Sequence, residues 1–325
     1  MRAAVCRSYG PPDVVTVEEI ESPPLCDGQV RVRVAAAAVN YPDVLVVANA
    51  YQISAPTPFV PGSEFAGAVV EVAADVDGVA LADVVTGTGL VGAFAEEVVV
   101  AANALQRIPA GVDQRIAAAF GVAHRTAYHV LRSVARVQPG DEVVVLGAGG
   151  GVGLAAVQLA TILGATVTAV ASSEQKLQAA ASYGARHLVN YRDGDLRQTL
   201  KNTLPGGSDV VVDPVGGDLA EPALRSMRRN GRFVTVGYAS GTIPRIPLNL
   251  VLLKGITIVG FEFRSWAEHE PTESARNERE LMSLLADGRA TPHIGATFAL
   301  DEVVDALKLV GDGKAVGKVV LDIDG

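Results

Sequence analysis

The sequence predicts an α/β protein in which a doubly wound parallel sheet is inserted into a β-rich domain. Its 325 residues exceed what one compact core usually holds, so two domains are expected. Up to about Gly121, short β runs broken by Pro and Gly indicate an antiparallel region. From there to about Phe263, strands alternate with helical segments, which is typical of a parallel sheet with helices on both faces.

The expected elements follow this division. The β-rich first region has three candidate strands, at 30–34, 66–72 and 95–100. The alternating middle region has six, at 142–146, 166–171, 188–190, 209–213, 232–236 and 256–260. The tail has a helix, a strand, a second helix and a final strand, at 274–286, 296–299, after Asp301 and at 318–323. We expect the tail to rejoin the first domain, so that the domains are 1–121 with 264–325, and 122–263.

Composition excludes several classes of protein. Hydrophobic residues make up 49% of the chain and charged residues 19%, as in a globular protein. The net charge of −9, with no basic block, argues against a nucleic-acid partner. No apolar run reaches the roughly 20 residues that span a bilayer, and the first residues lack the apolar segment of a signal peptide. We therefore expect a cytoplasmic protein without a membrane partner, in which Cys6 and Cys26 are plain thiols.

The strongest motif is a glycine-rich turn between an apolar strand and an apolar helix. The turn and its flanks run from Val143 to Gly153, and the next strand, 166–171, completes a βαβ unit. Backbone N–H groups at such a turn can bind a pyrophosphate, whose charge the helix dipole stabilises. The match to G-x-G-x-x-G is imperfect, and a turn that only packs helix on strand is the alternative. The residues expected to bind the cofactor here are Gly147, Ala148, Gly150, Gly151, Val152 and Gly153.

The end of the second strand bears on the choice of cofactor. An Asp or Glu at this place binds the ribose 2′-hydroxyl of NAD, whereas a 2′-phosphate prefers hydroxyls and cations. No acid stands at the tip, which reads Ser172-Ser173 and leads to Lys176. Glu174 lies slightly beyond it, where a helix N-terminus also explains it, and Lys176 could be a solvated helix residue. The residues favour NADPH and leave NADH open.

Taken together, several stretches resemble the medium-chain dehydrogenase/reductase family, in its zinc-free branch of quinone reductases and zeta-crystallins. They are the glycine turn and the segments 39–43, 61–67, 183–191, 213–217 and 317–321. The resemblance covers essentially the whole chain. It implies a GroES-like catalytic domain interrupted by a Rossmann domain, with the substrate in the cleft between them.

The resemblance also implies roles for single residues. Lys176 and Tyr191 would hold the 2′-phosphate with help from Ser172, and Thr126 and Asn40 would lie near the nicotinamide. Four further residues are expected at the cofactor, namely Val215, Gly237, Phe261 and Lys318.

The zinc ligands of alcohol dehydrogenases are missing from the matching segments. No Cys occurs in the segment 39–43, and Ser63 stands where those enzymes have a zinc-binding His. The region 83–104, which would hold their structural zinc, contains no Cys, and the five His show no i, i+4 pair. We therefore expect no metal.

Loss of the metal points to a particular class of acceptor. Without a Lewis acid, the acceptor must already be electrophilic, as quinones and α,β-unsaturated carbonyls are. Asn40 and Tyr51 are candidate donors to the developing negative charge, and Arg264 could orient the acceptor. Each has a plain structural alternative: Asn40 as a turn cap, Tyr51 as pocket wall and Arg264 as a surface residue. No catalytic acid is named, because water could supply the proton.

Two other functions stay open from the sequence. A reductase of enones, 2-alkenals or enoyl thioesters would use the same fold and chemistry. A non-catalytic NADPH-binding protein is disfavoured by Asn40, Thr126 and Arg264. We also expect a homodimer, because the apolar strand 255–261 is predicted at a sheet edge that a second copy could cover.

Overall fold

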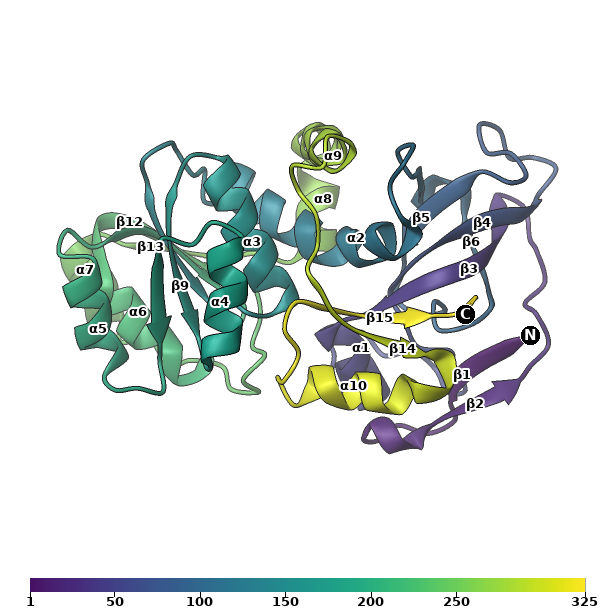
Figure 1. Cartoon of the computed structure of the whole chain (residues 1–325), viewed down its shortest axis with the longest axis horizontal. Helices are drawn as coiled ribbons and strands as arrows, with labels where there is room; N and C mark the ends of the chain where they lie inside the picture. The colour runs from purple at the N-terminus through teal and green to yellow at the C-terminus, as the bar shows by residue number, and fades with distance from the viewer. Residues whose placement is uncertain (325) are drawn as a thin grey trace. The chain divides into compact units, whose positions relative to one another are not determined.

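The structure is a computed structural model that describes residues 1–324. The chain forms two compact units (Figure 1). The first contains Met1–Val122 and the part that begins at Thr291, and the second is the continuous segment Ala123–Ala290. The sequence predicts the second boundary near residue 263. In the structure, residues 264–290 belong to the second unit instead of the first.

The first unit is β-rich, as expected, and is built on a seven-stranded sheet. Its strand order is β14-β15-β3-β4-β5-β7, with β6 paired to β3. Most neighbours are antiparallel; β14 and β15 are parallel. The strands of this sheet are β3 (Gln29–Val39), β4 (Glu64–Val72), β5 (Val84–Thr88), β6 (Glu97–Ala101), β7 (Leu105–Arg107), β14 (Ile294–Ala299) and β15 (Lys318–Asp322). A separate hairpin pairs β1 (Arg2–Cys6) with β2 (Val15–Glu19).

Two helices pack together beside this sheet, α1 (Tyr41–Val47) and α10 (Val303–Gly311). They bury Val46, Val47, Val303 and Leu307 in the same core as the apolar face of β3. The helix α1 begins with a capping box, in which Asp43 at the third helical position accepts from the N–H of Asn40. This cap fixes the backbone that carries both residues.

The second unit contains a six-stranded sheet in the order β10-β9-β8-β11-β12-β13, and all its strands are parallel. The strand order reverses between β8 and β11, where ligands of doubly wound folds bind. The strands are β8 (Glu142–Leu146), β9 (Thr166–Ala171), β10 (His187–Asn190), β11 (Ser208–Asp213), β12 (Met227–Thr235) and β13 (Thr257–Gly260). The predicted fold class is confirmed, and β13 forms the edge of the sheet as expected.

Helices connect these strands (Figure 1). They are α3 (Gly151–Ile162), α4 (Glu174–Ser182), α5 (Leu196–Thr203), α6 (Ala220–Ser226) and α7 (Leu248–Lys254). Leu146 and Val144 of β8 are fully buried between such layers, which explains why this strand is a continuous apolar run.

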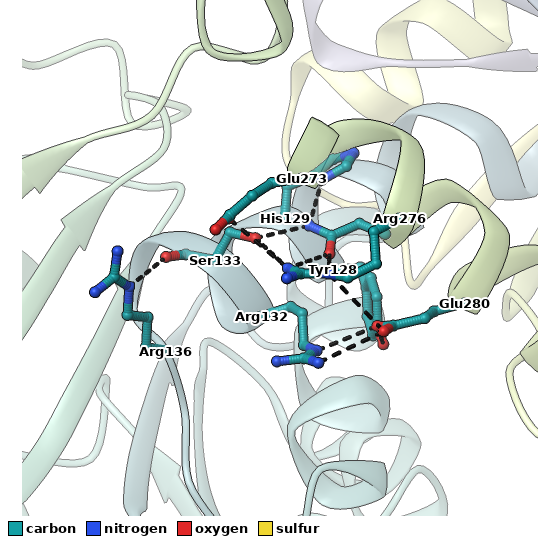
Figure 2. Close-up of polar contacts among 9 residues, drawn as sticks. Tyr128, His129, Arg132, Ser133, Arg136, Glu273, Arg276 and Glu280 are labelled. Carbon is teal, nitrogen blue, oxygen red and sulfur yellow. Dashed lines mark hydrogen bonds and ion pairs between the residues drawn. The ribbon is translucent and has the colours of Figure 1, made fainter. Parts of the chain in front are cut away.

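The boundary between the units lies later than expected because α9 is tied to α2 by polar contacts. The helix α2 (Gln114–His129) continues into a π-helix (Val130–Val134), and α8 (Phe263–His269) precedes α9 (Pro271–Ala286). Buried Asn277 donates to His129 and to Ser133, both at 2.9 Å (Figure 2). Arg125 binds Glu278 at 2.7 Å in the same interface. These contacts join residues about 150 apart in sequence, which local patterns do not reveal.

No helix in residues 1–324 is long and apolar enough to cross a membrane. The expected strands of both units are present, mostly with small shifts of their ends; β3 extends five residues beyond the predicted end, and β12 begins five residues before the predicted start. The short helices α1 and α8, the hairpin of β1 and β2, and the strands β5 and β7 were not predicted individually.

Candidate active site

The glycine turn lies between β8 and α3, as the motif predicts. A Cβ on Gly153 would overlap the carbonyl oxygen of Gly147 and come within 2.8 Å of the Cα of Ala148. Glycine is therefore required at 153 for helix and turn to pack closely. Gly150 differs, because its Cβ would have only one neighbour, the oxygen of Gly147 at 3.6 Å. Packing within the protein therefore does not require a glycine at 150. A ligand that approached the backbone of residue 150 closely would require one.

A second turn follows β11 beside this one. Asp213 is buried, and its Oδ1 accepts from the N–H groups of Val215 at 2.9 Å and Gly216 at 2.8 Å. Burial raises the pKa of Asp213, and these two hydrogen bonds oppose the shift. The side chain of Val215 would meet a Cβ placed on Gly147, so the two turns are in direct contact. This arrangement fixes Val215, one of the predicted cofactor residues, next to the glycine turn.

Cationic side chains gather where β9 and β10 end. Asn190 pairs with Ala171 in register, so Tyr191 follows β10 next to Ser172 after β9. A Cβ on Gly149 would overlap the aliphatic stem of Lys176, which shows that the lysine lies against the glycine turn. Burial lowers the pKa of Lys176, and the nearby positive charge of Arg192 lowers it further.

Two like charges held together in this way favour an anion between them. The sequence did not single out Arg192, although its position directly after Tyr191 was a usable signal.

The first unit holds a buried polar cluster, which we define as Asn40, Asp43, Ser63, Glu64 and Lys318. Lys318 Nζ lies 2.5 Å from Asn40 Oδ1 and 2.5 Å from Glu64 Oε1. The side chain of Lys318 is 3% exposed and that of Glu64 1%. The buried ammonium is thus matched by one carboxylate, the condition under which such a pair is tolerated.

Glu64 connects the rest of the cluster. Its Oε1 accepts from Asn40 Nδ2 at 2.8 Å, and its Oε2 accepts from the backbone N–H of Val122 at 2.7 Å. Asn40 Nδ2 also lies 3.2 Å from Ser63 Oγ. Both ends of the Asn40 amide are therefore engaged inside the protein, and its predicted role as a donor to substrate stays a prediction.

Asp43 completes the cluster from α1. It is fully buried, and its Oδ2 accepts from the N–H of Asn40 at 2.7 Å. Burial raises the pKa of Asp43 to about 7, while hydrogen bonds from Asn40 and Ser63 and the charge of Lys318 oppose the shift. The negative charge of Glu64 adds to the rise. This carboxyl group can hold a proton near neutral pH, unlike an exposed aspartate.

Comparison with known proteins is consistent with this geometry. Residues 26–110 match the family described as the alcohol dehydrogenase GroES-like domain, and residues 151–279 match the zinc-binding dehydrogenases. The chain is 39% identical to quinone oxidoreductase-like protein 2 of Bos taurus over 99% of its own length and 92% of that protein. The chain belongs to the medium-chain dehydrogenase/reductase family.

Two further proteins extend the comparison. Escherichia coli quinone oxidoreductase, solved in complex with NADPH, has a TM-score of 0.91 and 26% identity, covering 99% of this chain and 100% of that one. The chain is also 29% identical, over 99% of its length, to a segment covering 15% of a phenolphthiocerol/phthiocerol polyketide synthase subunit of Mycobacterium tuberculosis. The protein is accordingly an enzyme of the oxidoreductase type.

The cluster in the first unit does not suit the zinc that the family description implies. Asn40 and Ser63 offer amide and hydroxyl groups, and the carboxylate of Glu64 is already bound to the ammonium of Lys318. A divalent cation there would have to displace or repel that ammonium. Across residues 1–324, no group of three or more His, Cys, Asp or Glu side chains gathers into a metal site.

The remaining predicted residues divide between the two units. Tyr51 is half-buried beside the core of the first unit. In the second unit, Thr126 lies on α2 and is half-buried, Arg264 is exposed on α8, and Phe261 is buried. Gly237 follows β12, and its N–H contacts the carbonyl of Asp213 at 3.4 Å. Their roles stay predictions, as does the contact of Lys318 with a cofactor.

Proposed function

We propose that this enzyme is a zinc-independent reductase that uses NADPH to reduce quinones. The observation that carries the proposal is the ammonium of Lys318, bound to Asn40 and Glu64. Where zinc relatives place a metal ligand set, this chain has an amide, a hydroxyl and an internal cation. The catalytic unit is therefore suited to an acceptor that needs no Lewis acid.

The second unit supports NADPH as the cofactor. Bound NADPH would lie with its pyrophosphate at the glycine turn, where Gly150 and the N-terminus of α3 present backbone N–H groups. Its 2′-phosphate would be held by Lys176, Tyr191 and Ser172, to which we add Arg192. The Escherichia coli relative, solved with NADPH, supports this assignment.

Quinones fit this chemistry because their conjugated π-system spreads the incoming negative charge onto oxygen. When bound, NADPH supplies a hydride to the acceptor carbon. The protein's own contribution is alignment of the acceptor, with donors facing the oxygen that becomes negative. Tyr51 and Arg264 stay the candidates for binding and orienting the acceptor.

A turnover panel tests the proposal directly. NADPH oxidation is followed with benzoquinone, naphthoquinone, a 2-alkenal and crotonyl thioester, each with and without a metal chelator. We expect the quinones to be reduced and the chelator to have no effect. Zinc at one atom per chain that a chelator removes together with activity would contradict the proposal.

The second candidate is an enoyl thioester reductase, favoured by the similarity to a polyketide synthase segment. The same panel separates the two functions. A preference for crotonyl thioester over both quinones would select the second.

We further propose that the protein is a homodimer joined through β13. This edge strand pairs only with β12 among the described residues, and Ile258 on it is 38% exposed. Exposed leucines lie on the preceding helix α7, where Leu252 is 81% exposed. A second copy that pairs edge to edge about a two-fold axis would cover both features.

The other edge of the sheet provides a matched control. Leu188 on β10 has the same exposure as Ile258, 38%. We expect Ile258→Lys to give monomers at micromolar concentration in light scattering, because a charge on an edge strand opposes pairing. Leu188→Lys should leave the dimer intact. A monomeric wild-type protein, or equal behaviour of the two variants, would refute the proposed interface.

A further inference from the structure

The turns that follow β8, β11 and β12 lie side by side, because these strands are parallel neighbours in one sheet. Asp213 at the end of β11 connects two of them. Its side-chain Oδ1 accepts from the N–H groups of Val215 and Gly216 in its own turn, and its backbone carbonyl accepts from the N–H of Val236 at 2.8 Å. Asp213 is 0% exposed. One buried residue therefore joins the turn after β11 to the turn after β12.

The same two turns also pack against each other through their backbones. The N–H of Ser240 donates to the carbonyl of Val215 at 3.0 Å. A Cβ on Gly216 would come within 2.8 Å of the ring of Tyr238 and 3.0 Å of the carbonyl oxygen of Thr242. Gly216 has a φ of +67°, a conformation that favours glycine in any case. The two turns thus form one closely packed assembly.

This assembly places Val215 against the glycine turn. A Cβ on Gly147 would lie 2.6 Å from Val215 Cγ2, so this methyl group occupies the space over that glycine. Lys176, which follows β9 on the other side of β8, occupies the space over Gly149 in the same way. The glycine turn is therefore flanked by a lysine and a valine, and Asp213 holds the valine. Val215 is half-buried, so a bound molecule can still touch it.

The two oxygens of the Asp213 carboxyl group have different surroundings. Oδ1 holds both N–H groups, whereas the buried Oδ2 has no hydrogen-bond partner within residues 1–324. Thr235 pairs with Asp213 in register on β12, and its buried hydroxyl has no partner in the same part of the chain. The turn therefore requires one acceptor at the position of Oδ1. An asparagine could supply this acceptor, with its amide nitrogen in the place of Oδ2.

We propose that Asp213 is a positioning residue for the cofactor: it keeps Val215 against the glycine turn and so determines how tightly NADPH binds there. This inference rests on the proposed NADPH site and adds to it a buried residue that does not touch the ligand. A valine displaced by about 1 Å loses a large part of its van der Waals contact with a bound molecule. The effect of Asp213 on NADPH binding is therefore exerted through Val215.

A purely structural role is the competing explanation, because Asp213 is buried. Asp209 is a matched control on the same strand, where its Oδ2 accepts from the N–H of Glu142 at 2.8 Å and binds Arg228 at 2.6 Å. It stands near the amino end of β11, away from the glycine turn at the carboxyl end of β8. Asp209→Ala should lower the melting temperature and leave NADPH binding unchanged. Asp213→Asn keeps the required acceptor and should bind NADPH within about threefold of the wild type.

The test is a double-mutant cycle on the NADPH dissociation constant, measured by fluorescence titration. We expect Asp213→Ala and Val215→Ala each to weaken binding about tenfold. The double variant should bind no more weakly than Asp213→Ala alone. If the two losses multiplied in the double variant, Asp213 would act independently of Val215 and the proposal would fall. Wild-type affinity in Asp213→Ala would also overturn it.

A measurement on the wild type covers the case in which Asp213→Ala does not fold. Hydrogen exchange of the ligand-free protein should be slow at the amides of Val215 and Gly216, which donate to a buried carboxyl group. Fast exchange at both amides would contradict the proposal. Failure of the NADPH site itself has another signature: the wild type would bind no NADPH although both amides exchange slowly.

Discussion

The glycine turn of the second unit and the buried cluster of the first unit are both polar, but they are organised differently. At the turn, bare backbone and the half-buried cation of Lys176 lie together, and the positive charge of Arg192 is nearby. In the cluster, the ammonium of Lys318 is matched by Glu64 and sealed from solvent. The first arrangement gathers positive charge, whereas in the second the positive charge is matched by a buried carboxylate. The first is suited to an anionic ligand in our proposal, and the second to a fixed internal environment.

The largest effect is expected when the buried ammonium of Lys318 is removed from the cluster. Lys318→Met would leave Glu64 buried without its partner, and we expect a loss of about 3–5 kcal/mol in the free energy of unfolding. Urea denaturation measures this loss. The double variant Lys318→Met with Glu64→Gln should recover much of it, because no unpaired charge remains. A single variant as stable as the wild type would show that the pair is not sealed from water.

The titration of Asp43 gives a second test, with a definite sign. Its pKa of about 7 in the folded state lies above the ordinary 3.8, so the folded protein retains a proton that the unfolded chain releases. The free energy of unfolding should therefore fall as the pH rises from about 4 to about 7, then stay lower. Relative to Asp43→Asn, we expect a change of roughly 2–4 kcal/mol across this range. Chemical denaturation at several pH values checks it, and parallel curves for the two proteins would contradict it.

Two glycines of the turn allow packing to be separated from ligand binding. Gly153→Ala should destabilise the protein by about 1–3 kcal/mol, because the methyl group overlaps Gly147. Gly150→Ala meets no such neighbour and should keep wild-type stability while weakening NADPH binding at least about tenfold. Thermal unfolding and fluorescence titration measure the two effects. Equal loss of stability in both variants would remove the argument that Gly150 serves a ligand.

The cations at the end of β9 and β10 sharpen the comparison further. Lys176→Ala should weaken NADPH binding about ten- to hundredfold and leave NADH binding nearly unchanged, because only NADPH offers a 2′-phosphate. Arg192→Ala should act in the same direction by a smaller factor, since this side chain is exposed. Lys201→Ala, an exposed lysine on α5, is the control. If both cofactors weakened alike, Glu174 would become the better candidate for the ribose.

The glycine turn can be predicted from the sequence more completely than the buried cluster can, and the reason is physical. The glycine turn lies within one βαβ unit, so its motif, strand and helix are read together, and the structure has them where predicted. Ser172, Lys176 and Tyr191 are likewise close to the ends of successive strands. Arg192 was not predicted, because the only signal for it is its position directly after Tyr191, and an exposed arginine there is equally typical of a solvated turn.

The buried cluster depends on pairing that no local pattern contains. Lys318 and Asn40 are 278 residues apart, and they meet because β15 pairs with β3 in the register Val319↔Val39. The same limit explains the boundary near residue 290, since the contact between Asn277 and His129 spans 148 residues. Asp43 could be read as a helix cap but not as a buried acid, because its burial comes from the surrounding sheet and helix.

The pairing of β15 with β3 also affects which unit can finish folding first during translation. The second unit is a single continuous segment and can fold once Ala290 has emerged, whereas the first unit still lacks its final strand. Until Lys318 arrives, β3 has an open edge and Glu64 has no cation. Residues 1–122 must therefore wait, with an incompletely paired strand and an unneutralised carboxylate, until β15 has been translated. A ribosome that stops short of β15 would release a chain in which the nucleotide-binding segment is folded and the catalytic segment is not.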